Sequence, residues 1–220
     1  MSGDAISSKG VAMYLTKGAA EPTVVEPTAI TKAAPAVISA VAPGAAVGQL
    51  VRVNNSGFTS LDGKLFSVSA VDAGAGTFTL LGSDTTDEPG AMSDDAEVEM
   101  WDATDLVRLC LTSFTFNPET PGTTSVGTYC NPSATLPAVA TSAGTATLGG
   151  WIDKDDAGYK ELVLAAKDAA QRIFSIVLPQ AQGEIVAPIS FSNIAWDIPL
   201  DGGMAFTANG ALGSAPVHLF

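Results

Sequence analysis

Histidine and cysteine, on which many enzymatic and metal sites depend, are almost absent from this sequence. It contains one histidine, His218, close to its last residue, and two cysteines, Cys110 and Cys130. Histidine-based acid–base catalysis, hydrolytic triads and typical zinc sites need a histidine held in a rigid pocket. Two cysteines without a CxxC pattern support neither a disulfide scaffold nor a redox motif. We therefore expect no catalytic residue, no metal ligand and no cofactor, and we expect both cysteines to be buried free thiols.

Basic residues are also scarce. The 220 residues include 10 lysines and arginines against 23 aspartates and glutamates, which gives a net charge of −13. A protein that binds nucleic acid tightly needs a basic surface that displaces counterions from phosphate, so this composition argues against an ordinary nucleic-acid binder. Charged residues make up only 15% of the chain and hydrophobic residues 46%, which excludes a disordered tail. A low charge content is typical of subunits whose surface is covered by neighbours.

Long apolar runs are missing as well. The longest segments without a charge, 33–51 and 120–152, are interrupted by proline, glycine and threonine, so no membrane-spanning helix is expected. The first thirty residues carry acidic and basic side chains and no apolar stretch, so no secretory signal is expected.

The sequence does contain many short strand-like segments and one amphipathic helix. Apolar residues recur at three- and four-residue spacing, which predicts one buried helical stripe. The stripe consists of Tyr159, Leu162, Val163, Ala166, Ala169, Ala170 and Ile173. Asp155 and Asp156 precede it and are suited to cap its first turn. Strands are expected on either side of the helix at 145–152 and 172–179, followed by paired strands at 189–200 and 204–212.

A compact second unit is expected between residues 27 and 83. Segments rich in β-branched residues alternate there with glycine-containing turns, and prolines at its start separate it from the preceding chain. After it, residues 84–105 contain nine acids and no basic residue. We interpret most of this acidic run as a solvated linker, although Glu97, Glu99 and Trp101 alternate as in a strand.

The unit 27–83 resembles a small β module that recurs as an insertion in phage virion proteins. The resemblance rests on residues 27–32, on 47–53, on Gly57-Phe58 with Leu61-Asp62-Gly63, and on the closing segment 76–80. Removal of the module leaves a discontinuous domain, 1–26 and 84–220, in which residues 10–15 are expected to form a strand that returns to the C-terminal sheet.

One helix inside a β-protein, followed by paired strands, resembles the major tail tube proteins of long-tailed bacteriophages over residues 106–220. The resemblance implies a mainly β fold, a tail-tube-type β-sandwich or barrel subunit with one flanking α-helix, to which 27–83 adds a small all-β inserted domain. It also implies homohexameric rings that are assembled in the host cytoplasm and stack into the hollow tail tube of the virion. The implied partners are other copies of the chain, tail terminator and tail-tip proteins, and the tape-measure protein and then DNA in the lumen without tight binding; no membrane partner is implied.

Two sets of residues are expected to carry this function. Residues 117–150 are rich in Pro, Gly, Thr and Ser over a length that a compact domain rarely leaves unstructured. The resemblance assigns ring stacking to the start of this segment, namely Asn117, Pro118, Glu119, Thr120, Pro121, Gly122, Thr123 and Thr124. Strands near 106–116 and 189–212 are expected to build the tube wall. Acidic side chains in the lumen would repel DNA, and the candidates are Glu97, Glu99, Asp197 and Asp201.

Two other classes of function remain open. In one, the chain is a different phage virion component, such as a capsid decoration or a baseplate or attachment protein, and binds through the 27–83 module. In the other, it is a carbohydrate-active enzyme, although no aromatic sugar platform accompanies its acids.

Overall fold

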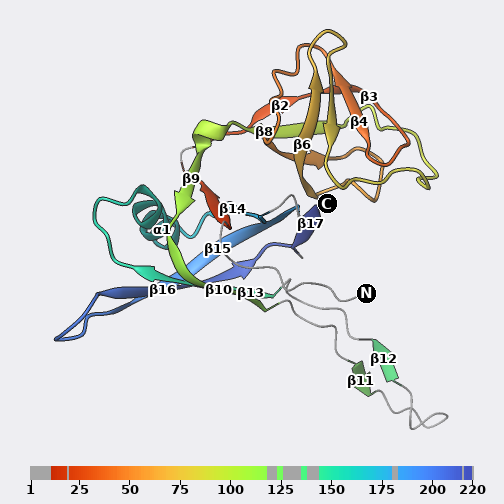
Figure 1. The fold of residues 1–220 in the computed structure, drawn as a ribbon. Coiled ribbons are helices and arrows are strands. Elements are labelled where there is room, and N and C mark those ends of the chain that lie inside the picture. The colour runs from red at the N-terminus through yellow and green to blue at the C-terminus, as the bar shows by residue number, and fades with distance from the viewer. Residues whose placement is uncertain are drawn as a thin grey trace, which may run out of the picture.

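The computed structural model describes residues 11–18, 20–117, 123–125, 135–137, 144–179, 183–214 and 216–219. These residues form a mainly β protein with two large antiparallel sheets, seen one above the other in Figure 1. In this part of the chain there is one α-helix, α1 (Ala157–Asp168), and one short 3-10 helix, η1 (Ala103–Asp105). The predicted fold class, mainly β with one flanking helix, is therefore confirmed. Among the described residues, no helix has the length and apolar content needed to cross a membrane.

The first sheet has eight strands and is built chiefly from the C-terminal half of the chain. Its order is β10 (Leu111–Asn117), β13 (Thr145–Trp151), β16 (Ala205–Leu212), β15 (Glu184–Asp197), β14 (Gln171–Val177), β1 (Ala12–Thr16) and β9 (Leu106–Leu109), and β17 (Val217–Leu219) pairs with β15. The strand predicted at 10–15 is β1, which returns to pair with β14 and β9. The paired strands predicted near 189–200 and 204–212 are β15 and β16.

The first sheet folds over on itself around a hydrophobic core, which we call the inner core. β10 and β14 are separated by three strands in the sheet order. Nevertheless, the rings of Phe114 on β10 and Phe174 on β14 stack with their centroids 5.0 Å apart. Helix α1 lies at one end of this core, where the ring of Tyr159 is 5.2 Å from that of Phe206 on β16. The helix therefore covers only part of the sheet.

Helix α1 begins where its sequence predicts. Asp156 is its N-cap, and its side chain accepts hydrogen bonds from the backbone N–H groups of Gly158 and Tyr159 at 2.6 and 3.3 Å. Gly158 lets the helix approach β9 closely, because a Cβ at this position would lie 2.4 Å from the carbonyl oxygen of Arg108.

The helix ends earlier than the apolar stripe predicts. Ala169 adopts a left-handed conformation with φ of 52°, and the chain turns there toward β14. Ala170 lies beyond the helix, and Ile173 is a buried residue of β14. The alanines favoured helix locally, but the packing of β14 between two cores determines where the helix stops.

The second sheet has seven strands and extends past the predicted boundaries of 27–83. Its order is β2 (Thr23–Val25), β8 (Glu97–Trp101), β5 (Leu50–Asn54), β6 (Leu65–Asp72), β7 (Thr77–Leu80), β4 (Val37–Ala40) and β3 (Pro27–Ile30). The two additional strands are β2 and β8, which pair with each other, and β8 also pairs with all of β5. We call this part of the structure, residues 23–101, the second unit.

Residues 84–105 are therefore not mainly a solvated linker. The Thr85 hydroxyl accepts a hydrogen bond from the Ala33 N–H at 3.0 Å, and the Glu88 carboxylate accepts one from the Ser60 N–H at 2.6 Å. Farther along, Val98 and Met100 of β8 are buried in the core of the second unit. Most of the charged residues in this run lie on the exposed side of β8 and in the loops beside it, whereas the alternate residues of the strand are buried.

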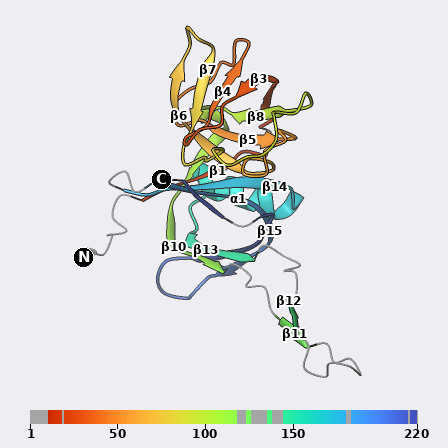
Figure 2. The same cartoon turned by 90° about the vertical axis from the view of Figure 1, so that its right-hand side faces the viewer.

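The two units share a hydrophobic core. Ile173, Val186 and Leu219 from the first sheet belong to the same buried cluster as Phe66 and Val68 of β6. Alternation along β14 explains this arrangement, because Ile173 faces the second unit while its neighbour Phe174 faces the inner core. Figure 2 shows the second unit lying against this side of the first sheet.

Two ion pairs of the buried Arg172 side chain connect α1 to β14. The Arg172 side chain is 3% exposed, and its guanidinium donates to the carboxylates of Glu161 at 3.2 Å and Asp168 at 2.6 Å. The same Glu161 carboxylate accepts a hydrogen bond from the backbone N–H of Gly18 at 2.7 Å, just after β1. Each charge is thus partnered, as burial requires.

Replacement of Arg172 should destabilise the fold strongly. Arg172→Met leaves the Glu161 carboxylate buried without its cation, which should lower the free energy of unfolding by about 3 to 5 kcal/mol. The matched control is Lys154→Met, because the Lys154–Asp155 pair is 86% and 77% exposed and should cost less than about 1 kcal/mol. Urea unfolding followed by circular dichroism measures both. Equal losses in the two variants would contradict a structural role for the Arg172 ion pairs.

A carboxylate also lies at the junction of the two units. Burial raises the pKa of Glu184 on β15, while hydrogen bonds from Ser175 and from Ser67 of the second unit partly oppose this shift. A raised pKa means that the folded state binds the proton more tightly than the unfolded state does. The contribution of Glu184 to stability is therefore favourable at low pH and is lost as the pH rises from the ordinary value of 4.5 through the raised pKa.

Glu184→Gln should remove this pH dependence. Its free energy of unfolding should exceed that of the unmodified chain at neutral pH, and the difference should vanish below pH 4.5. Urea titrations across the acidic range measure the difference. Glu21→Gln, at an exposed position, serves as the control and should show no comparable gain. A Glu184→Gln variant that is less stable at neutral pH would refute the argument.

Candidate functional site: assembly surfaces of the first sheet

One face of the strands β10, β13, β16 and the second half of β15 is exposed and nearly free of charge. We call this surface the polar face. Apart from the exposed indole of Trp151, the residues on it are small or polar: Ser113, Thr115, Asn117, Thr145, Thr147, Gly149, Ser190, Ser192, Asn193, Ala195, Asp197, Ala205, Thr207, Asn209 and Ala211. The one charge among them is Asp197 at the end of β15. An exposed sheet face more commonly carries lysines and glutamates, so this composition requires an explanation.

Hydrogen bonds run between strands across the polar face. The Thr147 hydroxyl donates to the Asn209 side-chain oxygen at 3.1 Å, and the Asn209 amide donates to the Asn193 side-chain oxygen at 3.2 Å. These bonds hold the side chains of three adjacent strands against the sheet. The result is a surface of hydroxyl and amide groups on which Asp197 is the one charged side chain.

This four-stranded part of the sheet has two open edges. In the described residues β10 pairs only with β13, and the second half of β15 pairs only with β16. Both edge strands contain an irregularity in register, between Leu111 and Ser113 on β10 and between Phe191 and Asn193 on β15. Unpaired edges bind further strands readily, so they are candidate contact surfaces.

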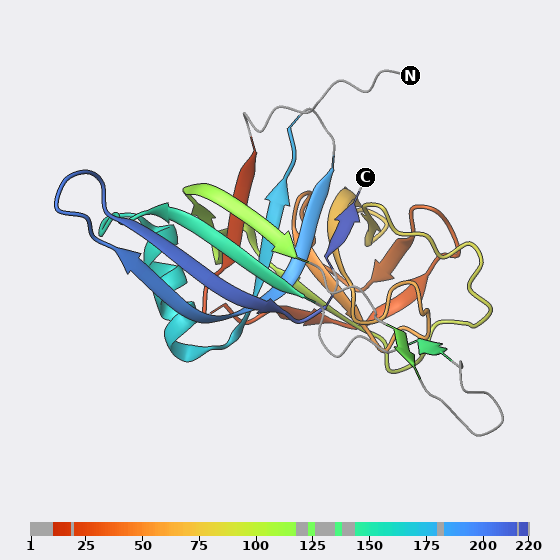
Figure 3. The same ribbon diagram turned by 90° about the horizontal axis from the view of Figure 1, so that it is seen from below.

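The connection between β15 and β16 projects beyond the sheet, and we call its residues 197–204 the arm. Figure 3 shows the arm extending away from the rest of the fold. Large apolar side chains on and beside it are exposed: Trp196 by 56%, Ile198 by 67%, Leu200 by 105% and Met204 by 47%. Trp196 also donates its indole N–H to the Tyr159 hydroxyl at 3.0 Å, which fixes the base of the arm to α1. A contiguous exposed apolar surface of this kind is typical of interaction sites.

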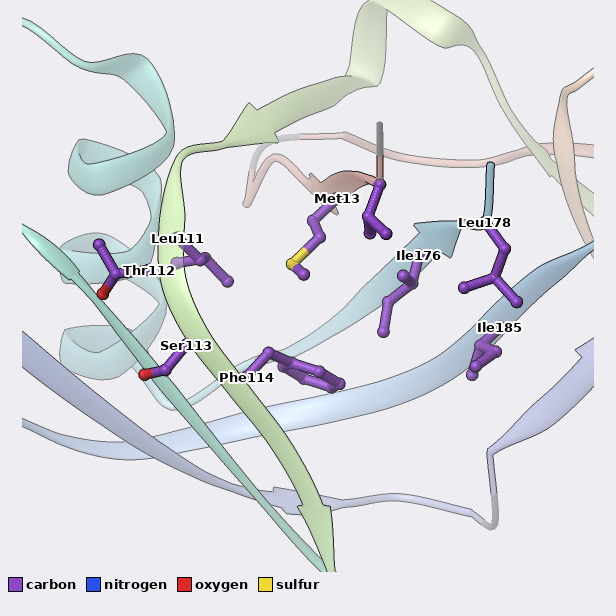
Figure 4. A pocket seen from close by; sticks show the side chains of 9 residues that line it. Met13, Leu111, Thr112, Ser113, Phe114, Ile176, Leu178 and Ile185 are labelled. Atoms are coloured by element: carbon purple, nitrogen blue, oxygen red, sulfur yellow. The ribbon is translucent and has the colours of Figure 1, made fainter. Parts of the chain in front are cut away.

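An apolar groove of about 460 Å³ lies between β10 and the strands β1, β14 and β15. Its lining residues are Val11, Met13, Leu111, Thr112, Ser113, Phe114, Ile176, Leu178 and Ile185, and none is charged. Figure 4 shows Met13, Phe114 and Ile176 directed into the groove from three strands. Helix α1 packs against another part of the inner core, where Tyr159 contacts Phe206.

The residues predicted for ring stacking are described only in part. Asn117 is the exposed last residue of β10, and Thr123 and Thr124 lie in β11 (Thr123–Ser125), which pairs with β12 (Thr135–Pro137). The intervening residues Pro118, Glu119, Thr120, Pro121 and Gly122 lie outside the described residues, and so does Cys130.

The four predicted lumen acids do not form one group. Glu97 and Glu99 lie on β8 of the second unit, where the Glu99 carboxylate forms an ion pair with Arg52. Asp197 lies on the polar face at the start of the arm, and Asp201 is exposed within the arm. The structure therefore joins only Asp197 to the uncharged surface described above.

Cys110 departs from its predicted burial. It is an exposed free thiol between β9 and β10, where the chain passes from one half of the folded sheet to the other. Partial burial, followed by the nearby Asp156 charge, raises the pKa of its thiol, which disfavours the reactive thiolate. In the part of the chain that the structure describes, no group of three or more His, Cys, Asp or Glu side chains is placed to hold a metal ion.

Comparison of the chain with protein-family models and with curated proteins finds no match.

Sequence reasoning missed the polar face, the arm and the groove. The alternation of Thr145, Thr147 and Gly149 with buried residues was a signal for the polar face, since none of the outward positions is charged. The apolar residues Trp196, Ile198 and Leu200 at alternate positions were a signal for the arm. The groove has no local signal, because its lining comes from strands far apart in the sequence.

Proposed function

We propose that this chain is the subunit of a hollow tail tube of a long-tailed bacteriophage, in which copies join edge to edge into hexameric rings that stack. The observation that carries the proposal is the polar face, an uncharged exposed surface bounded on both sides by open strand edges. Edge pairing between copies would convert each separate face into one continuous cylindrical lining.

The strand directions support ring closure. The four strands β10, β13, β16 and β15 are successively antiparallel, so β10 and β15 run in opposite directions. When β10 of one copy lies beside β15 of the next, the antiparallel alternation continues without interruption. The contact is head to tail, and such contacts form closed rings when the rotation between copies closes.

The composition of the polar face suits a conduit for DNA. Hydroxyl and amide groups remain hydrated and provide no cation that would bind phosphate, so DNA would pass without being held. The proposed lining is therefore neutral, with Asp197 as its acidic residue, and it does not include Glu97 or Glu99. Of the four acidic candidates named from the sequence, this proposal keeps Asp197 in the lining and treats the rest of the lining as uncharged.

The position of the second unit agrees with this arrangement. It packs against β14, β17 and the first half of β15, on the far side of the inner core from the polar face. In a tube that is lined by the polar face, the second unit therefore lies on the outside. Terminator, tail-tip and tape-measure proteins are the further partners that a tail tube would require.

Negative-stain microscopy of the purified chain tests the proposal. Hollow filaments of uniform diameter support a tube. Discrete particles that bind capsids would favour a decoration protein, and monomers at all concentrations would refute the proposal.

A charge swap tests how the edges join. Antiparallel pairing of β10 with a neighbour's β15 brings the Leu111 end of β10 near the neighbour's Asp197. Ser113→Glu should therefore raise the protein concentration needed for assembly roughly two- to fivefold, because like charges on facing strands repel. Adding Asp197→Lys to this variant should restore assembly, as measured by sedimentation. Asn117→Glu, at the far end of the same strand and face, should not be rescued by Asp197→Lys. Rescue of Asn117→Glu in place of Ser113→Glu would contradict this strand polarity.

Ring stacking is assigned by the sequence to residues 117–124. Deletion of residues 119–126 should give folded subunits that form rings but do not elongate, and these rings should cap the growing tubes of the unmodified chain. Microscopy of mixed samples measures the length distribution. Elongation of the deleted chain at an unchanged rate would show that ring stacking depends on other residues.

A further inference from the structure

We infer that the exposed apolar side chains of the arm of one copy dock in the apolar groove of the next copy. The inference rests on the proposed head-to-tail assembly and adds to it a specific contact, made by side chains rather than by strand edges. The occupant of the groove is thus a second copy of this chain.

The arm presents exposed apolar side chains. Trp196 pairs with Phe206, which is buried in the inner core, so Trp196 lies on the inner-core side of β15. Ile198 and Leu200 follow in the connection beyond β15, and both are exposed. The exposed apolar side chains of the arm therefore begin, at Trp196, on the same side of the sheet as the groove.

The groove begins at the open edge of β10. Leu111 and Phe114 line it from this strand, and Val11 and Met13 line it from β1. A neighbour's β15 placed antiparallel along β10 ends at the Leu111 end, and its arm then continues toward Met13. The two side chains would also lie on the same side of the joined sheet, because Phe114 and the neighbour's Trp196 would both be on the inner-core side.

The chemistry of the two surfaces matches as well. All the charge on the arm is carried by Asp197 and Asp201, and Asp197 lies on the polar face, away from Trp196. The groove contains no charged residue that would have to lose its hydration on contact. Insertion removes from water two side chains, Ile198 and Leu200, that are largely exposed in the isolated chain.

Disulfide trapping between different copies tests the contact. Both variants carry Cys110→Ser and Cys130→Ser; one adds Leu200→Cys, and the other adds Met13→Cys and an affinity tag that gives it a distinct mass. Under mild oxidation, their mixture should give a mixed dimer, identified by mass, that neither variant gives alone. The control replaces Met13→Cys with Leu164→Cys on α1, which is 53% exposed and lies outside the groove. A yield no higher than that of this control would overturn the inference.

The chain's own first ten residues are the alternative occupant of the groove. If they fill it, the mixed dimer forms only after residues 2–10 are removed from the Met13→Cys variant, and this result would also overturn the inference. Microscopy of the same samples separates the two proposals. Tubes without the mixed dimer would support the tube proposal and refute the arm contact. The mixed dimer without tubes would support the arm contact and refute the tube proposal.

Substitution of the arm gives a second measurement. Leu200→Glu should raise the concentration needed for assembly about tenfold or more, because a charge cannot enter an apolar groove. The variant should fold normally, since Leu200 is fully exposed in the isolated chain. Val41→Glu is the matched control, because Val41 is 82% exposed on the second unit and should have no effect on assembly. Unchanged assembly of Leu200→Glu would overturn the inference.

Discussion

The hydrogen-bonded pair of β14 and the first half of β15 supports both hydrophobic cores. Ile173 and Val186 face the second unit, while Phe174 and Ala187 face the inner core. Because these strands are covered on both faces, the two units cannot separate without exposing apolar surface to water. The remainder of β15 leaves this buried layer and becomes the exposed edge and arm of the first sheet. A buried framework thus positions a surface that is available for contacts.

Local patterns were sufficient to predict most elements of the first sheet. The helix start at Asp156 follows from capping chemistry, and β15 and β16 follow from alternation in their sequences. The end of the helix was not predictable, since Ala169 and Ala170 favour helix and the turn is imposed by the burial of Arg172 and Ile173 in β14.

Long-range pairing limited what could be predicted about the second unit and the candidate site. β2 and β8 complete the second sheet from opposite ends of that unit, and no short stretch of sequence reveals that Thr23 lies opposite Met100. The acids around β8 favoured the reading as a linker, although Val98 and Met100 already alternated with them. The groove could not be predicted from local sequence either, because Met13 and Phe114 are brought together only when the first sheet folds over.

The two irregular positions on the edge strands have a consequence for the size of an assembly. A bulge bends its strand and increases the local twist, and here the bulges near Thr112 and Ser192 lie on the two strands that would meet a neighbour. Each copy contributes four strands that alternate in direction. An antiparallel ring can therefore close with any number of copies. In the proposed tube, the angle between successive copies would therefore depend on these two bulges. The diameter of the proposed channel would then be encoded at two positions, each one residue long.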